Sequence, residues 1–197
     1  QCLVGSEMCI RDRLDGDVQG KLQGMSKQLK QVSIDTGAAT SDLTDGLYQV
    51  VSAFGESAES VKQLEIAAKA AKAGNATTTD SVNMLSAVTK GYGDTSAAAL
   101  QKASDLAFLT VKLGQTSFPE LASSMGQVVP LAATMKVSQE ELFGAMATLT
   151  GVTGGTAEVT TQLRATMQEF LSPSSQMEKA LKKMGYTSGA AALESEG

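Results

Sequence analysis

Few residues in this chain could do chemistry, and their spacing does not gather them at one point. Glu140 and Glu141 form the clearest pair of carboxylates. Neighbouring side chains on a helix point about 100° apart, so this pair would not converge on one substrate atom as paired acid and base catalysts must. We therefore interpret Glu141 as a helix-capping acid and Glu140 as a first-turn charge, which the positive end of a helix favours.

Nucleophilic catalysis is also poorly supported. The chain has no histidine, and no Ser-x-x-Lys places a lysine base near a serine. Its two cysteines, Cys2 and Cys9, are too few for a zinc site and make a poor disulfide framework. We expect no catalytic residue, no metal site and no cofactor, and we do not expect an enzyme. An active site on the loops between helices is the less favoured alternative, which loss of an activity in Glu140→Gln would support.

The glycine-rich stretch "GVTGGT", from Gly151 to Thr156, invites comparison with a phosphate-binding loop. It lacks the Lys-Ser/Thr that ends such a loop and follows a helical pattern rather than a strand, so we interpret it as a turn between helices. Thr156 is then a candidate N-cap, and Arg164 is interpreted as a member of a surface ion pair. Three aspartates lack the alternating spacing of a calcium-binding loop: Asp35, Asp42 and Asp45.

The composition limits the classes of protein that are possible. With 197 residues, 42% of them hydrophobic, the chain can bury a sizeable core. Its net charge of -5 argues against specific nucleic-acid binding, which needs a basic surface. No apolar run approaches the roughly 18 residues that span a bilayer, so we expect no membrane segment in this stretch. We interpret Lys182 and Lys183 as a solvated helix face.

The elements that hold these residues should be helices, because one pattern recurs beyond residue 40. It consists of a hydroxyl residue, an acid three positions later, an apolar stripe and a closing glycine. At this spacing the hydroxyl accepts from a backbone N–H of the first turn, and the reciprocal bond from the acid is expected mainly from Glu. Four segments have this spacing: Thr77–Asp80, Ser117–Glu120, Ser138–Glu141 and Ser175–Glu178.

Apolar residues recur at helical spacing between these signals. Three sets should each form one buried face: Val61, Leu64, Ala68 and Ala71; Leu106, Leu109 and Leu113; and Leu142, Ala145, Met146 and Leu149. Helices are expected to end near Gly74, Gly91, Gly93, Gly114, Gly151 and Gly185. Pro130 falls inside a helical pattern and should kink or divide that helix.

The predicted fold class is therefore all-α, because no segment shows the alternation typical of strands. We expect a multi-helix bundle of seven or eight short capped helices, with short loops that make neighbours run antiparallel. An extended, coiled-coil-like helix should precede the bundle, since apolar residues from Leu14 to Val32 are spaced three or four apart.

The expected division of the chain has four parts. Residues 1–13 differ in composition from the rest and are expected to be a non-native leader. Residues 14–34 form the extended amphipathic helix, and residues 35–190 form a helical core. Residues 191–197 are expected to be a truncated end.

Three stretches, read in order, carry a family resemblance. They are "AAKAAKAG" (Ala67 to Gly74), "LTVKLGQTSFPELASSMGQVVPLAATMKVSQEELFGAMATLTGVTGGTAEVTTQLRATMQEFLSPS" (Leu109 to Ser174) and "ALKKMG" (Ala180 to Gly185). With them, residues 35–190 resemble the core region of phage tail tape measure proteins, a minor tail protein family of long-tailed phages and prophages. The resemblance lies in the order of the elements and includes no catalytic signature.

The resemblance implies a structural role in the phage virion. A tape measure protein occupies the tail lumen, sets tail length during tail assembly and is released through the tube at DNA ejection. The implied partners are the tail tube protein, tail assembly chaperones and distal tail tip proteins, and self-association is expected. The protein would be made in the cytoplasm of the bacterial host.

A helical coiled-coil adaptor or signalling module, without enzymatic activity, is the alternative. It predicts long uninterrupted heptads after residue 40. The sequence has short helical patterns separated by glycines instead, which favours the structural tail protein.

Overall fold

The computed structural model describes residues 18–189 and 191–192. The described residues form helices and no strand, which confirms the all-α prediction. The helices are α2 (Val18–Thr36), α3 (Thr40–Phe54), α4 (Ser60–Gly74), α5 (Thr78–Gly91), α6 (Ala97–Leu113), α7 (Phe118–Thr134), α8 (Gln139–Thr153), α9 (Thr156–Leu171) and α10 (Ser175–Lys183). The expectations for residues 1–13, including Cys2 and Cys9, and for residues 193–197 lie outside the described residues.

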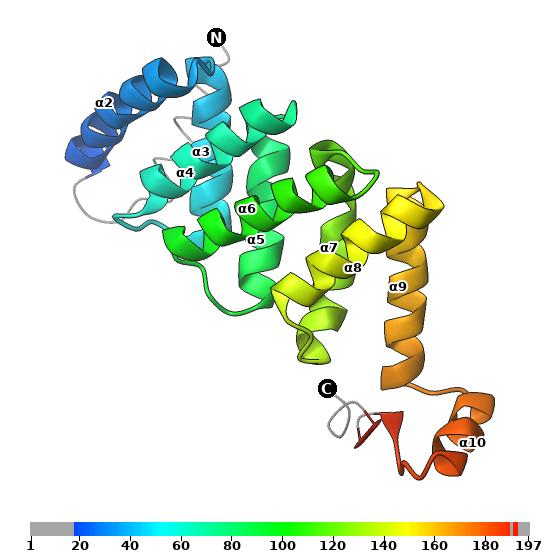
Figure 1. The fold of residues 1–197 in the computed structure, drawn as a ribbon. Coiled ribbons are helices and arrows are strands. Elements are labelled where there is room, and N and C mark those ends of the chain that lie inside the picture. Colours follow the sequence, from blue (N-terminus) through cyan, green and yellow to red (C-terminus); the bar gives the residue numbers. More distant parts are fainter. Residues whose placement is uncertain (1–17, 190, 193–197) are drawn as a thin grey trace.

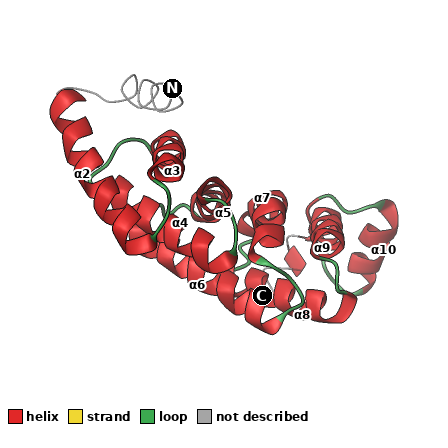
Figure 2. Ribbon diagram, turned by 90° about the horizontal axis from the view of Figure 1, so that it is seen from above, coloured by secondary structure: helices red, strands yellow, loops and turns green. Residues whose placement is uncertain are grey.

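The helices from α2 to α9 alternate between two rows (Figure 1). An outer row holds α2, α4, α6 and α8, and an inner row holds α3, α5, α7 and α9, seen nearly end-on in Figure 2. The most extensive contacts join helices two apart in the chain: α5 with α7, α7 with α9, and α3 with α5. Consecutive helices therefore do not form a series of antiparallel hairpins. The chain crosses from one row to the other at each loop. The helices pack on neighbours within a row and also across the rows, as α4 does on α3 and α5.

The same positions are used in successive helices of the inner row. The fourth residue of α3, α5, α7 and α9 is fully buried in each case: Leu43, Ser81, Leu121 and Val159. The third residue is acidic in each case: Asp42, Asp80, Glu120 and Glu158. One structural repeat is thus a pair of helices spanning about 40 residues, and stacking of such pairs builds a continuous core.

Ser81 differs from the other buried positions of this repeat, and Ser81→Ala is expected to stabilise the fold by about 1 kcal/mol. Its hydroxyl is buried without a hydrogen-bond partner, whereas the three equivalent residues are aliphatic. Alanine removes the cost of burying that hydroxyl and is also a better helix former. Urea denaturation measures the change, with Ser41→Ala on the exposed surface of α3 as the control for helix propensity alone. A loss of stability in Ser81→Ala would contradict this reasoning.

The C-terminal half of the expected coiled-coil seam packs inside the array. Leu29 and Val32 are buried, and Met25 is partly buried against the core. Through them α2 contacts α3 and α4, as the first helix of the outer row. These apolar residues belong to the chain's own core, and the helix ends at Thr36.

The predicted buried face of α6 is wrong. Leu109 and Leu113 are exposed, and Leu106 is only partly buried. The buried face consists mainly of small residues: Ala97, Ala99, Leu100, Ala103, Ser104, Ala107 and Thr110. Because α6 lies between α4 and α8 in the outer row, small side chains allow the helix backbones to approach closely, and the larger leucines point away. The stripes predicted for α4 and α8 are confirmed, each with buried and partly buried members.

One predicted helix end is also wrong, and of the two outcomes predicted at Pro130, a kink or a division, the division does not occur. The α8 helix continues through Gly151 to Thr153 and ends at Gly154, which takes the left-handed conformation (φ +83°) that a helix C-cap favours. The α7 helix runs through Pro130 to Thr134 and is not divided. Proline leaves the carbonyl of Gly126 without its helical partner, but Gly126 is exposed with open space beside it, so water can satisfy that group.

Candidate functional site

Most of the polar residues that the sequence singles out act as helix caps. At the start of α8, the backbone N–H of Ser138 donates to Glu141 Oε2 at 2.8 Å, and the N–H of Glu141 donates to Ser138 Oγ at 3.2 Å. Ser117 and Glu120 make the same reciprocal pair at α7. These capping boxes confirm the predicted role of Glu141.

The other two predicted caps differ in detail. Thr77 caps α5 by accepting from the N–H of Asp80 at 3.0 Å, while the Asp80 carboxylate accepts from the Thr77 hydroxyl at 2.7 Å. At α10 the cap is Ser174 rather than the predicted Ser175. Ser174 has an extended backbone (ψ 161°) and accepts from the N–H of Met177, which leaves Ser175 as the first helical residue.

The carboxylate of Glu120 also joins the starts of α7 and α9. The Thr156 hydroxyl lies 2.9 Å from Glu120 Oε2 and 2.7 Å from the hydroxyl of Thr116. Thr156 is therefore not the N-cap that the sequence predicted; Gly155 holds that position, and Thr156 is the buried first residue of α9. The glycine-rich turn brings this hydroxyl back to a helix that begins nearly 40 residues earlier, so the turn serves packing between helices. No phosphate-binding role follows from this geometry.

A second polar group surrounds the start of α8. Lys102 Nζ of α6 lies 2.6 Å from Glu140 Oε1. Tyr92, in the loop between α5 and α6, lies close enough for the negative charges of Glu140 and Glu141 to raise the pKa of its hydroxyl. Hydrogen bonding to Lys102 lowers the pKa of Glu140, and hydrogen bonding to Ser138 lowers the pKa of Glu141. Both carboxylates are thus held ionised at neutral pH, which suits caps and ion pairs and removes them as proton donors.

Tyr92 gives this group a measurable signature. Burial, together with the charges of Glu140 and Glu141, raises the pKa of Tyr92 from 10.0 to about 12. Because the unfolded chain ionises first, stability should be intact below pH 10 and fall as the pH rises from 10 towards 12. The chain has three tyrosines and no tryptophan, so absorbance titration of tyrosinate can resolve one late-titrating group. Tyr92→Phe should remove that group and flatten the alkaline loss of stability. Normal titration of all three tyrosines would contradict the expected environment.

The remaining candidate residues are not brought together. Arg164 is exposed, and no carboxylate of the described residues lies within ion-pair distance of it, so the predicted ion pair is absent. Lys182 and Lys183 are exposed in the last turn of α10, as predicted. In the part of the chain that the structure describes, no three metal-ligating side chains form a cluster. None of the described helices is both long and apolar enough to cross a membrane.

A small pocket of about 100 Å³ lies between α10 and the segment that follows it. It is lined by Pro173, Glu178, Leu181, Lys182, Thr187 and Ser188. The Ser188 hydroxyl is already engaged, because it accepts from the N–H of Ala191 at 3.1 Å. The charged residues in the lining are Glu178 and Lys182, and the lining contains no histidine or cysteine. The pocket therefore does not have the usual pairing of a nucleophile with an adjacent base.

Two polar features were missed in the sequence. Ser96 caps α6 through the N–H of Ala99, but no acid follows at the third position to complete the recurring pattern. The grouping of Tyr92, Lys102 and Glu140 joins residues from separate helices and loops. Only the packing of α6 beside α8 reveals it.

The protein is thus a helical scaffold whose polar residues cap helices and join its two rows. Residues 26–195, which cover most of the chain, match the family model of the phage-related minor tail protein. No curated protein and no solved structure matched the chain. The chain belongs to the family of phage-related minor tail proteins.

Proposed function

We propose that this chain is a segment of a tape measure protein, which sets tail length as the tail assembles and is released through the tube at DNA ejection. Its family makes it a structural protein of the phage tail, and the tape measure is a finer role within that class. The observation that carries the proposal is the regular stacking of helix pairs, in which polar residues cap and link helices. A chain of repeated units converts residue number into length.

The proposal includes a place and a set of partners. The protein would occupy the tail lumen of the virion after synthesis in the bacterial host. There it would contact the tail tube protein and the distal tail tip proteins, and assembly chaperones would bind it before the tube closes around it. Several copies would associate along the tail.

The folded array and an extended helix differ in the length that each residue contributes along the tail. An uninterrupted helix advances about 1.5 Å per residue, whereas a stacked helix pair advances by roughly one interhelical distance, 8–10 Å, for about 40 residues. The length contributed by each residue thus reports whether this region is extended or stacked in the assembled tail.

The test uses the intact parent gene. In-frame removal of α6 and α7 (Ala97–Thr134), and separately their duplication, should shorten and lengthen the tails measured by electron microscopy. A change of about 1.5 Å per residue would indicate an extended chain, and a much smaller proportional change would indicate a stacked array. Tails of unchanged length in both variants would overturn the tape measure proposal.

The control separates residue number from stability. Phe118→Ala leaves the number of residues unchanged but should destabilise the same block. If tail length follows residue number, this variant should assemble fewer tails of normal length. Tails shortened by Phe118→Ala alone would show that length does not depend on the number of residues.

The coiled-coil adaptor is less well supported by this structure. It requires long exposed heptads, but the helices among the described residues are 9 to 19 residues long. Among the seam residues with described side chains, Leu29 and Val32 lie in the core and Met25 packs partly buried against it.

A further inference from the structure

The helices of the outer row bury residues at the same relative positions. In α4, α6 and α8 four residues, separated by three, one and three positions, form one side of the helix. We call them the outer-row frame. The frame residues are Ser60, Gln63, Leu64 and Ala67; Leu100, Ala103, Ser104 and Ala107; and Gln139, Leu142, Phe143 and Met146. All are buried except Gln139, which is partly buried, and the frame advances by 40 and then by 39 residues.

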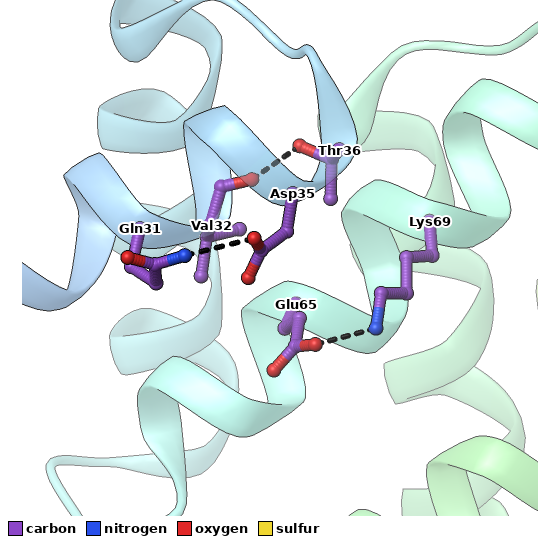
Figure 3. A network of polar contacts seen from close by, with 6 residues as sticks. All are labelled: Gln31, Val32, Asp35, Thr36, Glu65 and Lys69. Atoms are coloured by element: carbon purple, nitrogen blue, oxygen red, sulfur yellow. Dashed lines mark hydrogen bonds and ion pairs between the residues drawn. The ribbon is translucent and has the colours of Figure 1, made fainter.

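The outer-row frame occurs once more, at α10. A further shift of 38 residues selects four apolar residues: Met177, Ala180, Leu181 and Met184. The charged residues of α10 all lie outside the frame: Glu178, Lys179, Lys182 and Lys183. Helices already in the row also carry charges outside the frame, as α4 does in the ion pair of Glu65 with Lys69 (Figure 3). By its sequence pattern, α10 is the next helix of the outer row.

In this structure α10 does not lie in the row. Among the described residues it makes no extensive contact with another helix, and Figure 1 shows it at the end of α9, apart from α8. Only Leu181 of its frame is buried. Met177 is partly buried, Ala180 is exposed, and Met184 is 61% exposed. The apolar frame of α10 is therefore only partly used in the observed arrangement.

The place that α10 would take lies on the side of α8 that faces away from α6. Each earlier outer-row helix packs against the next, α4 against α6 and α6 against α8. The carbonyl of Phe143 accepts a hydrogen bond from Thr110 of α6 at 3.2 Å, and the Cβ position of Gly114 lies 3.0 Å from Ala147 Cα. Because two residues correspond to about 200° of helical turn, the opposite side of α8 is the one with Ala145, Leu149 and Val152. Val152 is 81% exposed.

We propose that α10 docks against this side of α8 as a further member of the outer row, in a second arrangement of the chain. The contact of Thr110 with Phe143, shifted by one repeat, becomes a contact of Leu149 with Leu181. Ala180 and Met184 then become buried, whereas the charged residues of α10 stay in water. Stacking of one more helix extends the continuous core by the same contacts that join α6 to α8.

The connection between α9 and α10 allows this movement. It consists of Ser172–Ser174 and is as short as Met135–Ser138, which leads from α7 in the inner row to α8 in the outer row. The chain can therefore turn into the outer row without unwinding α9. Docked, α10 closes the end of the outer row; undocked, it leaves α8 uncovered. The inference does not depend on the tape measure role, because it follows from the array alone.

Cysteine pairs at equivalent positions test the docking. Asp105, Gly144 and Lys182 each follow the third frame residue, in α6, α8 and α10. The full chain, with Cys2 and Cys9 changed to serine, carries Gly144→Cys with Lys182→Cys and is treated, at high dilution, with a short bis-maleimide. Neighbouring helices lie about 8–10 Å apart, within reach of this reagent. Mass spectrometry of the digested chain measures the rate of linkage within one chain.

Two reference pairs calibrate this rate. Asp105→Cys with Gly144→Cys joins helices that are already neighbours, and Asp105→Cys with Lys182→Cys spans two helix spacings. The Gly144–Lys182 pair should link at least tenfold faster than the distant pair. A rate no faster than that of the distant pair would overturn the proposal. So would linkage found only between chains, because it would assign this side of α8 to a second copy.

Matched variants separate docking from random motion of α10. Ala180→Asp with Met184→Asp places two charges in the frame and should slow linkage at least tenfold. Lys179→Asp with Lys183→Asp introduces the same residues outside the frame and should leave the rate unchanged. All four positions are exposed in the observed arrangement, and thermal melts verify folding. Equal effects of the two double variants would show that α10 meets α8 without docking through its frame, and the proposal would fail.

Discussion

Phe118→Ala is expected to lower the free energy of unfolding by about 3–5 kcal/mol, as truncation of a fully buried aromatic ring does. Phe118 is the first residue of α7 and is 1% exposed. Its ring stacks on Phe108 of α6 with centroids 5.1 Å apart, and it lies against Gly74, where an added Cβ would stand 2.5 Å from Phe118 Cγ. One side chain thus joins three helices from both rows. Its removal leaves a cavity that their backbones cannot easily close.

Urea denaturation of the purified chain measures this loss. Leu109→Ala is the control, because it also truncates a large apolar side chain of the same region, but one that is about half exposed. A surface change of this kind should alter stability by within about 0.5 kcal/mol. If both variants lost the same stability, the junction of α4, α6 and α7 at Phe118 would not hold the array together.

Local signals predicted the helices and their starts well. Ser117 with Glu120, and Ser138 with Glu141, form capping boxes because all the atoms involved lie within one turn of the chain. A cap therefore depends little on what the rest of the protein does. The same is true of the helix ends near Gly74 and Gly91.

Features that depend on the arrangement of the rows could not be predicted this way. The stripe of Leu106, Leu109 and Leu113 has helical spacing. Spacing alone does not say which face is buried in a helix that has neighbours on two sides, as α6 has in α4 and α8. In α6 the close approach of α4 and α8 favours Ala103 and Ala107 at the contact. Thr156 likewise suits an N-cap by type, yet its hydroxyl finds Glu120 on a distant helix. In both cases the packing of neighbouring helices, rather than the size or type of the residue itself, decides which side chain is buried and which partner it meets.

Gly114→Ala tests that distance directly and is expected to destabilise the fold by about 1–3 kcal/mol, the usual cost of overpacking. Gly114 follows α6, and its backbone is extended (φ −101°, ψ −176°), a conformation that alanine adopts without strain. A new Cβ would instead lie 2.9 Å from the carbonyl oxygen and 3.0 Å from the Cα of Ala147, and would also meet the Thr150 hydroxyl. Because the first two atoms belong to the backbone of α8, the end of α6 has to move away from α8.

Gly144→Ala is the matched control and should change stability in the opposite direction. Gly144 lies within α8 with no atom within 4 Å of its added Cβ. Alanine there should stabilise the helix by up to about 1 kcal/mol, because glycine is a poor helix former. Denaturation of the two variants side by side therefore separates helix propensity from packing between helices. If Gly114→Ala were neutral or stabilising, α6 and α8 would not be as closely packed as this array requires.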